Sequence, residues 1–250
     1  MSGTQRRRIT SRMEYGWSGS VSDLRSLADF VSEQMSLRRD SALSELRASE
    51  RPLADYDVAR VENAFIIRGR ATYRSSHGST ESTEDTASDL LADLDLRAIE
   101  SFNLSNSGDA GTRRDRVTID LRRWDVGLTV DSDDAAWARG LEANILAELR
   151  KNRPWWSHLR GKAGILVSWI LWFATSLAYF LPNSPNRIKD TGSLVWITFI
   201  LSGASWFAIR WLLPAFDISN TSTAGRTTRR VAGFGAFALP VILFALSLVI

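Results

Sequence analysis

Few residues in this 250-residue chain could carry out catalysis. It has two histidines, His77 and His158, and no cysteine, which excludes thiol chemistry, disulfides and cysteine-bound metal. His77 opens the acidic run HGSTESTEDTASD, where a hydrolase or a metal site could place it. Such a run is more typical of a solvated loop, and His158 has no second ligand near it. We therefore predict no enzymatic activity, no metal and no other cofactor, with an unrecognised enzyme centred on His77 as the third-ranked hypothesis.

Three carboxylates in DSDDAAW, those of Asp131, Asp133 and Asp134, could in principle hold Ca²⁺. The run lacks the glycine and the distant glutamate of an EF-hand loop. It also directly precedes a helical pattern, in which Trp137 and Leu141 recur at four-residue spacing. Helix capping therefore explains these aspartates, because negative charge is favourable at a helix N-terminus.

Arginine clusters are the remaining candidates for binding chemistry. RGRATYR and RRDRVTIDLRR place arginines on the faces or ends of expected strands, and neither a G-x-G-x-x-G motif nor a Walker lysine accompanies them. A guanidinium matches phosphate geometry, so these clusters could bind a phosphate or an anionic nucleotide messenger. The simpler interpretation, that they are solvent-facing strand positions, carries more weight. The candidate anion-binding residues are Arg68, Arg70, Arg113 and Arg114.

Charge is distributed unevenly along the chain. Residues 1–150 hold 21 arginines and 26 acidic residues, whereas residues 151–250 hold 10 basic and 2 acidic residues. The basic overall balance therefore does not indicate nucleic-acid binding, because the positive charge lies in the apolar part of the chain.

The residue pattern around these candidates predicts an α+β domain, mainly an antiparallel sheet packed with two long helices. One helix should follow Ser20 and run towards Pro52, with a break near residues 38–40, and the other should occupy residues 131–150. We expect strands at 15–18, 61–73 and 98–104. Residues between 74 and 94 should form a mobile loop with one short helix at 88–94.

A hairpin is expected where the apolar alternation changes phase. Val117, Ile119 and Leu121 occupy odd positions, whereas Trp124 and Val126 occupy even ones. If residues 122–123 form the turn, Leu121 faces Trp124 and the apolar side chains share one face. Two arginines are poor turn residues, so a bulge or a longer loop remains an alternative.

Three apolar segments follow, at residues 163–181, 193–213 and 231–250. At about 1.5 Å per residue each would be roughly 30 Å long, the thickness of a bilayer core, so we predict an all-α membrane unit of three transmembrane helices. The distribution of Lys and Arg around the segments places the N-terminal domain in the cytoplasm and the C-terminus outside. The expected localisation is the inner cell membrane, as a multi-pass protein.

The segment KNRPWWSHLRGK lies between the domain and the first apolar segment, and its indoles and cations suit a membrane interface. A base-stacking platform for nucleic acid is the alternative, disfavoured because the preceding domain is acidic. The expected interface anchors are Lys151, Arg153, Trp155, Trp156, Arg160, Lys162, Arg210, Trp211, Arg229 and Arg230.

Small residues recur in the apolar segments at four-residue spacing, which permits close packing of helices within one chain or between chains. The expected helix-packing residues are Ala174, Ala178, Gly203, Ala204, Ala208, Ala232, Gly233 and Ala236.

The predicted organisation is a basic tail (1–12), the α+β domain (13–150), an interface linker (151–162) and the helical unit (163–250). We expect a non-enzymatic protein whose domain binds a partner or small ligand and couples that event to the helices, for example as a membrane-perturbing effector. A passive scaffold or assembly factor is the close alternative. The expected partners are a lipid bilayer, another protein or a second copy of the chain, with a small ligand as a further option and no nucleic acid.

Overall fold

The computed structural model describes residues 7–13, 16–48, 55–74, 80–93, 99–109, 114–154, 156–160, 162–178, 191–213 and 215–218. It also describes the single positions Val231, Gly235, Ala238 and Ile242. The chain divides into two units, each described separately below. Unit 1 comprises residues 1–153 and 215–221, and unit 2 comprises residues 154–214 and 222–250.

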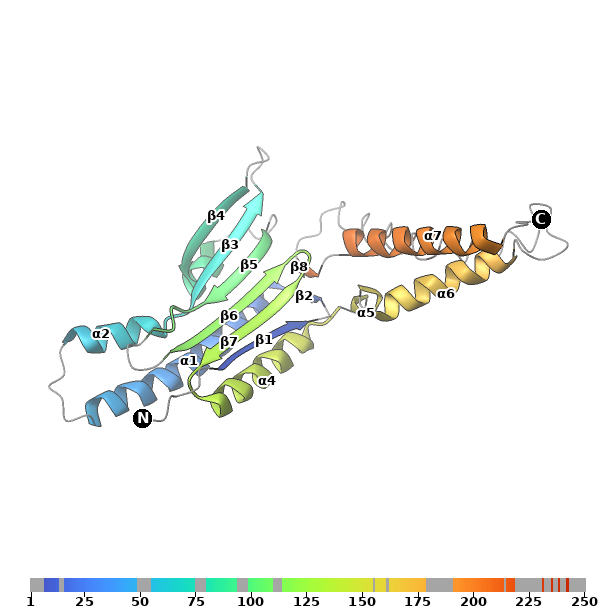
Figure 1. Ribbon diagram of the computed structural model, residues 1–250. Coiled ribbons are helices and arrows are strands. Elements are labelled where there is room, and N and C mark those ends of the chain that lie inside the picture. Colours follow the sequence, from blue (N-terminus) through green and yellow to red (C-terminus); the bar gives the residue numbers. More distant parts are fainter. Residues whose placement is uncertain are drawn as a thin grey trace. The chain divides into compact units, whose positions relative to one another are not determined.

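Unit 1 is an α+β domain built on a six-stranded antiparallel sheet (Figure 1). In spatial order its strands are β1 (Arg7–Met13), β7 (Val126–Ser132), β6 (Asp115–Arg122), β5 (Ile99–Ser105), β3 (Arg68–Arg74) and β4 (Thr80–Thr86). The α+β expectation is therefore confirmed for this part of the chain. Along β5, β6 and β7 buried and more exposed residues alternate, because successive side chains point to opposite faces.

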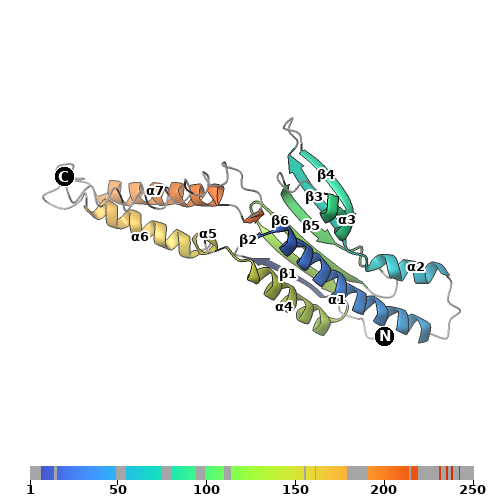
Figure 2. The ribbon, with the colours of Figure 1, turned by 180° about the vertical axis from the view of Figure 1, so that it is seen from behind.

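Helices cover one face of this sheet. They are α1 (Val21–Ala48), α3 (Ala87–Asp93) and α4 (Ala135–Lys151), and their apolar side chains share one core with the inward residues of β5, β6 and β7. Figure 2 shows α1 and α3 in front of the sheet, and they lie behind it in Figure 1. The opposite face of the sheet is left for polar residues.

Local sequence explains where α1 begins. The backbone N–H of Ser20 donates to Asp23 (2.6 Å), and the backbone N–H of Asp23 donates to the Ser20 hydroxyl (3.2 Å). This reciprocal pair is a capping box, which satisfies N–H groups that have no partner within the helix. α1 then continues without the expected break through residues 38–40.

Two expected elements differ from the prediction. The first part of the strand expected at 61–73 belongs to helix α2 (Asp55–Ala64), because Val61, Ala64 and Phe65 are buried at helical spacing. The acidic segment expected to be a mobile loop contains β4, an edge strand paired with β3 along its whole length. β4 shows no apolar alternation, and backbone pairing together with the ion pair of Arg70 with Glu84 holds it against β3. Residues 7–12 of the expected basic tail likewise belong to the other edge strand, β1 (Arg7–Met13).

The β6–β7 hairpin forms with a shifted register. Leu121 pairs with Val126, and Ile119 pairs with Leu128. Mutual backbone bonds between Arg122 and Asp125 (2.8 and 3.2 Å) close the turn, so Arg123 and Trp124 form the two-residue loop. Trp124 is consequently exposed, and only the other apolar side chains of the hairpin reach the core.

A second, two-stranded sheet joins β2 (Trp17–Gly19) in parallel to β8 (Phe216–Ile218). Both ends of the segment 154–214 are fixed beside β2. The N–H of Ser18 donates to the carbonyl of Asn152 (2.8 Å), and the N–H of Trp17 donates to the carbonyl of Ala215 (2.6 Å). Two consecutive residues of β2, Trp17 and Ser18, thus bind the last part of unit 1 before residue 154 and its first residue after 214.

Unit 2 contains α5 (Ser157–Arg160), α6 (Lys162–Ala178) and α7 (Thr191–Leu212). Figure 1 shows α6 and α7 side by side. The indole N–H of Trp172 in α6 donates to the hydroxyl of Ser205 in α7 (2.7 Å), and the Ser168 hydroxyl donates to the carbonyl of Ser202 (3.4 Å). The two helices therefore meet through buried polar groups.

No helix among the described residues is both long enough and apolar enough to cross a bilayer. α6 has 17 residues, about 26 Å of helix, which is less than the roughly 30 Å of a bilayer core. α7 reaches the length, but its described residues include Thr198, Ser202, Ser205 and Arg210. The third segment, 231–250, lies outside the described residues except for four positions. For the described part of the chain, the prediction of a membrane unit with transmembrane helices is therefore wrong, and with it the multi-pass, inner-membrane localisation.

Candidate anion-binding face

The uncovered side of the sheet carries an open groove of about 860 Å³ over β3, β5 and β6. We call this surface the open face. Alternation along the strands directs their polar residues to it, while their apolar neighbours enter the core. Its lining includes Asn63, Arg68, Arg70, Thr72, Glu84, Ser101, Asn103, Ser105, Ser107, Arg116, Thr118, Asp120 and Arg122.

In the middle of the open face, arginines form ion pairs with acidic residues of the same face. Arg70 forms an ion pair with Glu84, which lies opposite it on β4. Asp120 accepts hydrogen bonds from the side chains of Asn103 (2.6 Å) and Arg122 (3.2 Å). Arg70, Asn103 and Asp120 occupy one row across the strands, since Arg70 is paired with Asn103 and Asn103 with Asp120.

Two further arginines of the open face, Arg68 and Arg116, are exposed and have no ion pair or side-chain hydrogen bond among the described residues. Arg68 is paired with Ser105, and Ser105 with Thr118, the outward neighbour of Arg116 on β6. Arg68 and Arg116 are therefore two strands apart, about 10 Å across the sheet, and one outward position, about 7 Å, apart along it. They lie at the same end of the face.

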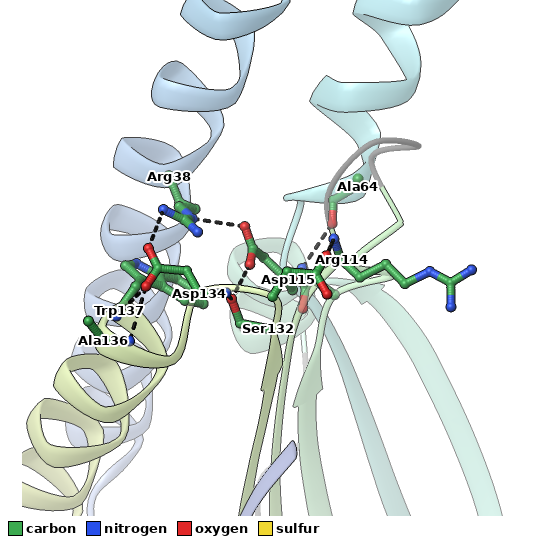
Figure 3. A network of polar contacts seen from close by, with 10 residues as sticks. Arg38, Ala64, Arg114, Asp115, Ser132, Asp134, Ala136 and Trp137 are labelled. Carbon is green, nitrogen blue, oxygen red and sulfur yellow. Dashed lines mark hydrogen bonds and ion pairs between the residues drawn. The ribbon is translucent and has the colours of Figure 1, made fainter. Parts of the chain in front are cut away.

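The structure separates the four arginines named from the sequence. Arg68 and Arg70 line the open face, whereas Arg113 lies outside the described residues. Arg114 forms an isolated bridge with Asp109, and its backbone N–H donates to Asp133 (3.2 Å). Figure 3 shows its side chain pointing away from the neighbouring polar network.

Arg116 and Arg122 belong to the segment RRDRVTIDLRR considered for anion binding, but they are not among the four candidate residues. The signal was present in the expected strand at 117–121, because Arg116, Thr118, Asp120 and Arg122 alternate with three buried apolar residues. Their grouping with Arg68 required the strand order β6-β5-β3, which alternation does not reveal.

A buried polar network lies where α1 meets the start of α4 (Figure 3). Arg38 of α1 donates to Asp115 (2.8 Å) and Asp134 (3.4 Å), and its guanidinium lies 4.7 Å from the centre of the Trp137 ring. Asp115 is 1% exposed and also accepts a hydrogen bond from the Ser132 hydroxyl. Because every member bonds to another, the network fixes the helices to the sheet and serves structure rather than chemistry.

Of the three aspartates ahead of α4, Asp134 acts as the cap, whereas Asp133 accepts a hydrogen bond from the backbone N–H of Arg114 and Asp131 is a buried residue of β7. The Asp134 carboxylate accepts from the N–H groups of Ala136 (3.0 Å) and Trp137 (3.1 Å). The Trp137 N–H bond is the main cause that lowers the pKa of Asp134, with the Ala136 N–H and Arg38 adding to it. The backbone N–H of Ser20 similarly lowers the pKa of Asp23. Among the described residues, no group of histidines and acids is placed to hold a metal ion.

The residues expected at a membrane interface lie in varied surroundings. Trp156 is buried against Ile209 and Leu213, and Arg160 is buried as well. Lys162 and Trp211 are exposed, as is Arg210, whose guanidinium lies over the Trp206 ring at 5.1 Å. Lys151 is exposed and pairs with Glu148, and Arg153 is half-buried at the end of unit 1. Trp155, Arg229 and Arg230 lie outside the described residues.

The small residues expected to pack helices are not those that join α6 to α7. Gly203 and Ala204 are exposed, and a Cβ on Gly203 would meet no atom within 4 Å. Ala174 and Ala208 are half-buried, Ala178 belongs to α6, and Ala232, Gly233 and Ala236 lie outside the described residues. His77 also lies outside them, and His158 is exposed in α5.

Comparison of the chain with models of protein families, with curated proteins and with solved structures gives no match.

Proposed function

We propose that the chain is a non-enzymatic binding protein whose open face takes up a partner or small ligand. The backbone contacts of β2 with Asn152 and Ala215, which we call the β2 junction, would transmit that event to α6 and α7. The open face supports binding, because it is a groove with several polar groups converging on it. The hydroxyl–carboxylate contacts of Ser132 with Asp115 and of Ser20 with Asp23 lie in the polar network and in the cap of α1, not in this groove.

One observation carries the proposed transmission. The N–H of Ala215, which follows α7 along the chain, donates to the carbonyl of Arg123 (2.6 Å). Arg123 follows Arg122, a residue of the open face. A ligand that moves Arg122 would therefore also displace Arg123, whose carbonyl binds Ala215. The carbonyl of Ala215 in turn accepts a hydrogen bond from the N–H of Trp17 in β2.

Hydrogen exchange of the full-length chain tests both parts of this proposal. The chain should be prepared in a non-ionic detergent, because α6 and α7 expose large apolar side chains. The probes are inorganic tripolyphosphate, citrate and a poly-glutamate peptide, three anions of different chemistry. We expect at least one to slow exchange in β3, β5 and β6 and to change exchange in α6 and α7. No protection of the open face by any of them would overturn the binding proposal.

Ala215→Pro isolates the transmission step, since proline lacks the N–H that bonds to Arg123. This variant should keep the protection of the open face and lose the change in α6 and α7. Ala136→Ser, an exposed change on α4 away from the junction, is the control.

A passive scaffold is the second candidate, favoured by the surface of unit 2. Trp196, Phe199, Ile200 and Phe207 of α7 are 62–68% exposed, whereas Thr198, Ser202 and Ser205 of the same helix are buried. Exposed apolar patches mark contact with another molecule. The partners expected from the sequence, a lipid bilayer and a second copy of the chain, both stay predictions. Occupation of the open face without any change in α6 and α7 would favour the scaffold.

A further inference from the structure

The charge of the open face stands out against the rest of unit 1. Its lining contains four arginines and two acidic residues, in a part of the chain where acidic residues outnumber arginines by 26 to 21 over residues 1–150. Positive charge is therefore concentrated on the side of the sheet that none of the described helices covers. Such concentration attracts anions and raises their local concentration.

The uncompensated charge is confined to one end of the face. Arg70 and Arg122 are paired with Glu84 and Asp120, so their charges are already satisfied. Arg68 and Arg116 are not paired among the described residues, and the lining around them supplies neutral donors from Asn63 and Ser105. A ligand at this end would find two free guanidinium groups and several side-chain hydrogen-bond donors.

The backbone beside Arg116 is closely packed and hydrogen-bonded. Gly108 has a φ of 67°, and a Cβ on it would lie 2.6 Å from the Cβ of Arg116. The loop is held further by Asn106, whose side chain bonds to Ala64, Asp115 and Val117 at 2.7–2.9 Å. The backbone that carries Arg116 is therefore rigid, and a rigid backbone lowers the entropic cost of binding.

From this arrangement we infer that Arg68 and Arg116 form a binding site for a small ligand that carries two or more phosphate groups. The inference rests on the proposed function and names its ligand class. Arginine presents a planar fork that bonds phosphate oxygens in pairs, and the separation of the two strands suits two anionic groups better than one. Phe102, the aromatic residue among the described residues of the lining, is 1% exposed and lies in the core, so that ring is not available for stacking a base. Recognition is therefore directed at the phosphates.

Calorimetric titration of the full-length chain with inorganic tripolyphosphate tests the site. Arg68→Ala and Arg116→Ala should each weaken binding about 10-fold or more, because each removes a charge-assisted hydrogen bond to phosphate. The double variant should show no measurable binding. Arg68→Lys should fall between Arg68→Ala and the unchanged protein, since lysine keeps the charge but not the fork. Arg139→Ala, an exposed arginine of α4 outside the groove, should bind as the unchanged protein does.

Glu84→Gln provides a test in the opposite direction. It removes the carboxylate that holds Arg70, and so adds a third free guanidinium to the groove. Affinity for tripolyphosphate should rise several-fold, while a site elsewhere would be indifferent to this change.

The outcomes separate this inference from the proposed function. Equal binding by Arg139→Ala and the Arg68→Ala/Arg116→Ala variant would overturn the inference. Protection of the open face by citrate or poly-glutamate, with no binding of tripolyphosphate, would also overturn it but leave the proposed function standing. Tripolyphosphate bound through Arg68 and Arg116, with no effect on exchange in α6 and α7, would support the site and count against the transmission.

Discussion

At the scale of single residues, Arg38 is a charged side chain in a largely buried environment. Its side chain is 11% exposed and bonds to two carboxylates, one of which, Asp115, is almost fully buried. A buried ion pair adds little net stability, yet removal of one partner leaves an uncompensated charge. The bonds of Asp115 to both Arg38 and Ser132 explain how the chain tolerates a carboxylate at this depth.

Arg38→Met should lower the free energy of unfolding by about 3 kcal/mol, because it leaves Asp115 charged and without its guanidinium partner. Adding Asp115→Asn should restore part of this loss. Chemical denaturation of the unchanged protein and both variants measures the two values. A loss below about 1 kcal/mol for Arg38→Met would show that solvent reaches Asp115.

Asp134 makes the stability of unit 1 depend on pH. Its pKa is lowered in the folded state, chiefly by the Trp137 N–H, so the charged form stabilises the fold at a pH above its ordinary value of about 4. This contribution is lost as the pH falls through the lowered pKa. Asn caps a helix as well as Asp but does not titrate. The free energy of unfolding between pH 6 and pH 2 should therefore fall less steeply for Asp134→Asn than for the unchanged protein, and parallel curves would contradict the assignment.

At the scale of elements, α6 and α7 reverse the usual arrangement of helices. Ser168, Thr198, Ser202 and Ser205 are buried, whereas several large apolar side chains are exposed. Hydrogen bonds join the two helices at these buried polar residues, alongside the buried apolar side chains of Trp172 and Ile209. These polar contacts therefore contribute to the pairing of α6 with α7.

Ser205→Ala should weaken this pairing, because it leaves the buried N–H of Trp172 without an acceptor, at a cost of about 1–3 kcal/mol. Hydrogen exchange in α6 and α7 should become correspondingly faster. Gly203→Ala is the matched control on the exposed side of α7, where a Cβ has free space and helix propensity improves. Equal exchange in the two variants would show that the Trp172–Ser205 bond does not hold the helices together.

At the scale of the whole molecule, the main feature is the return of the chain to unit 1 through β8. β2 binds the chain both before and after the segment 154–214. Gly16 makes this approach possible, since a Cβ at that position would lie 2.6 Å from the carbonyl oxygen of Ala215.

Gly16→Ala should therefore displace Ala215 and cost about 1–3 kcal/mol, as overpacking against backbone usually does. Hydrogen exchange at Trp17 and at β8 should increase. Gly127→Ala, where the nearest atom would be 3.9 Å from the new Cβ, is the control and should leave β2 and β8 unaffected. Unchanged protection of Trp17 in Gly16→Ala would contradict the role given to this junction.

The sequence alone determined the features that depend on near neighbours. The cap of α1, the cap and core face of α4, and the alternation of β5 to β7 follow from residues a few positions apart, and all are present in the structure. The local residue pattern did not predict β1 and β4, because both are mostly polar edge strands whose backbone pairs with a strand far away or across a polar loop. The prediction of membrane spans was wrong as well. It depended on the apolar composition of each segment, whereas the length and polarity of the helices that form decide whether they can cross a bilayer. Only the tertiary structure placed Arg68 on the same face as Arg116 and joined β2 to β8, since these contacts link residues far apart in the chain and leave no periodic signal in either segment.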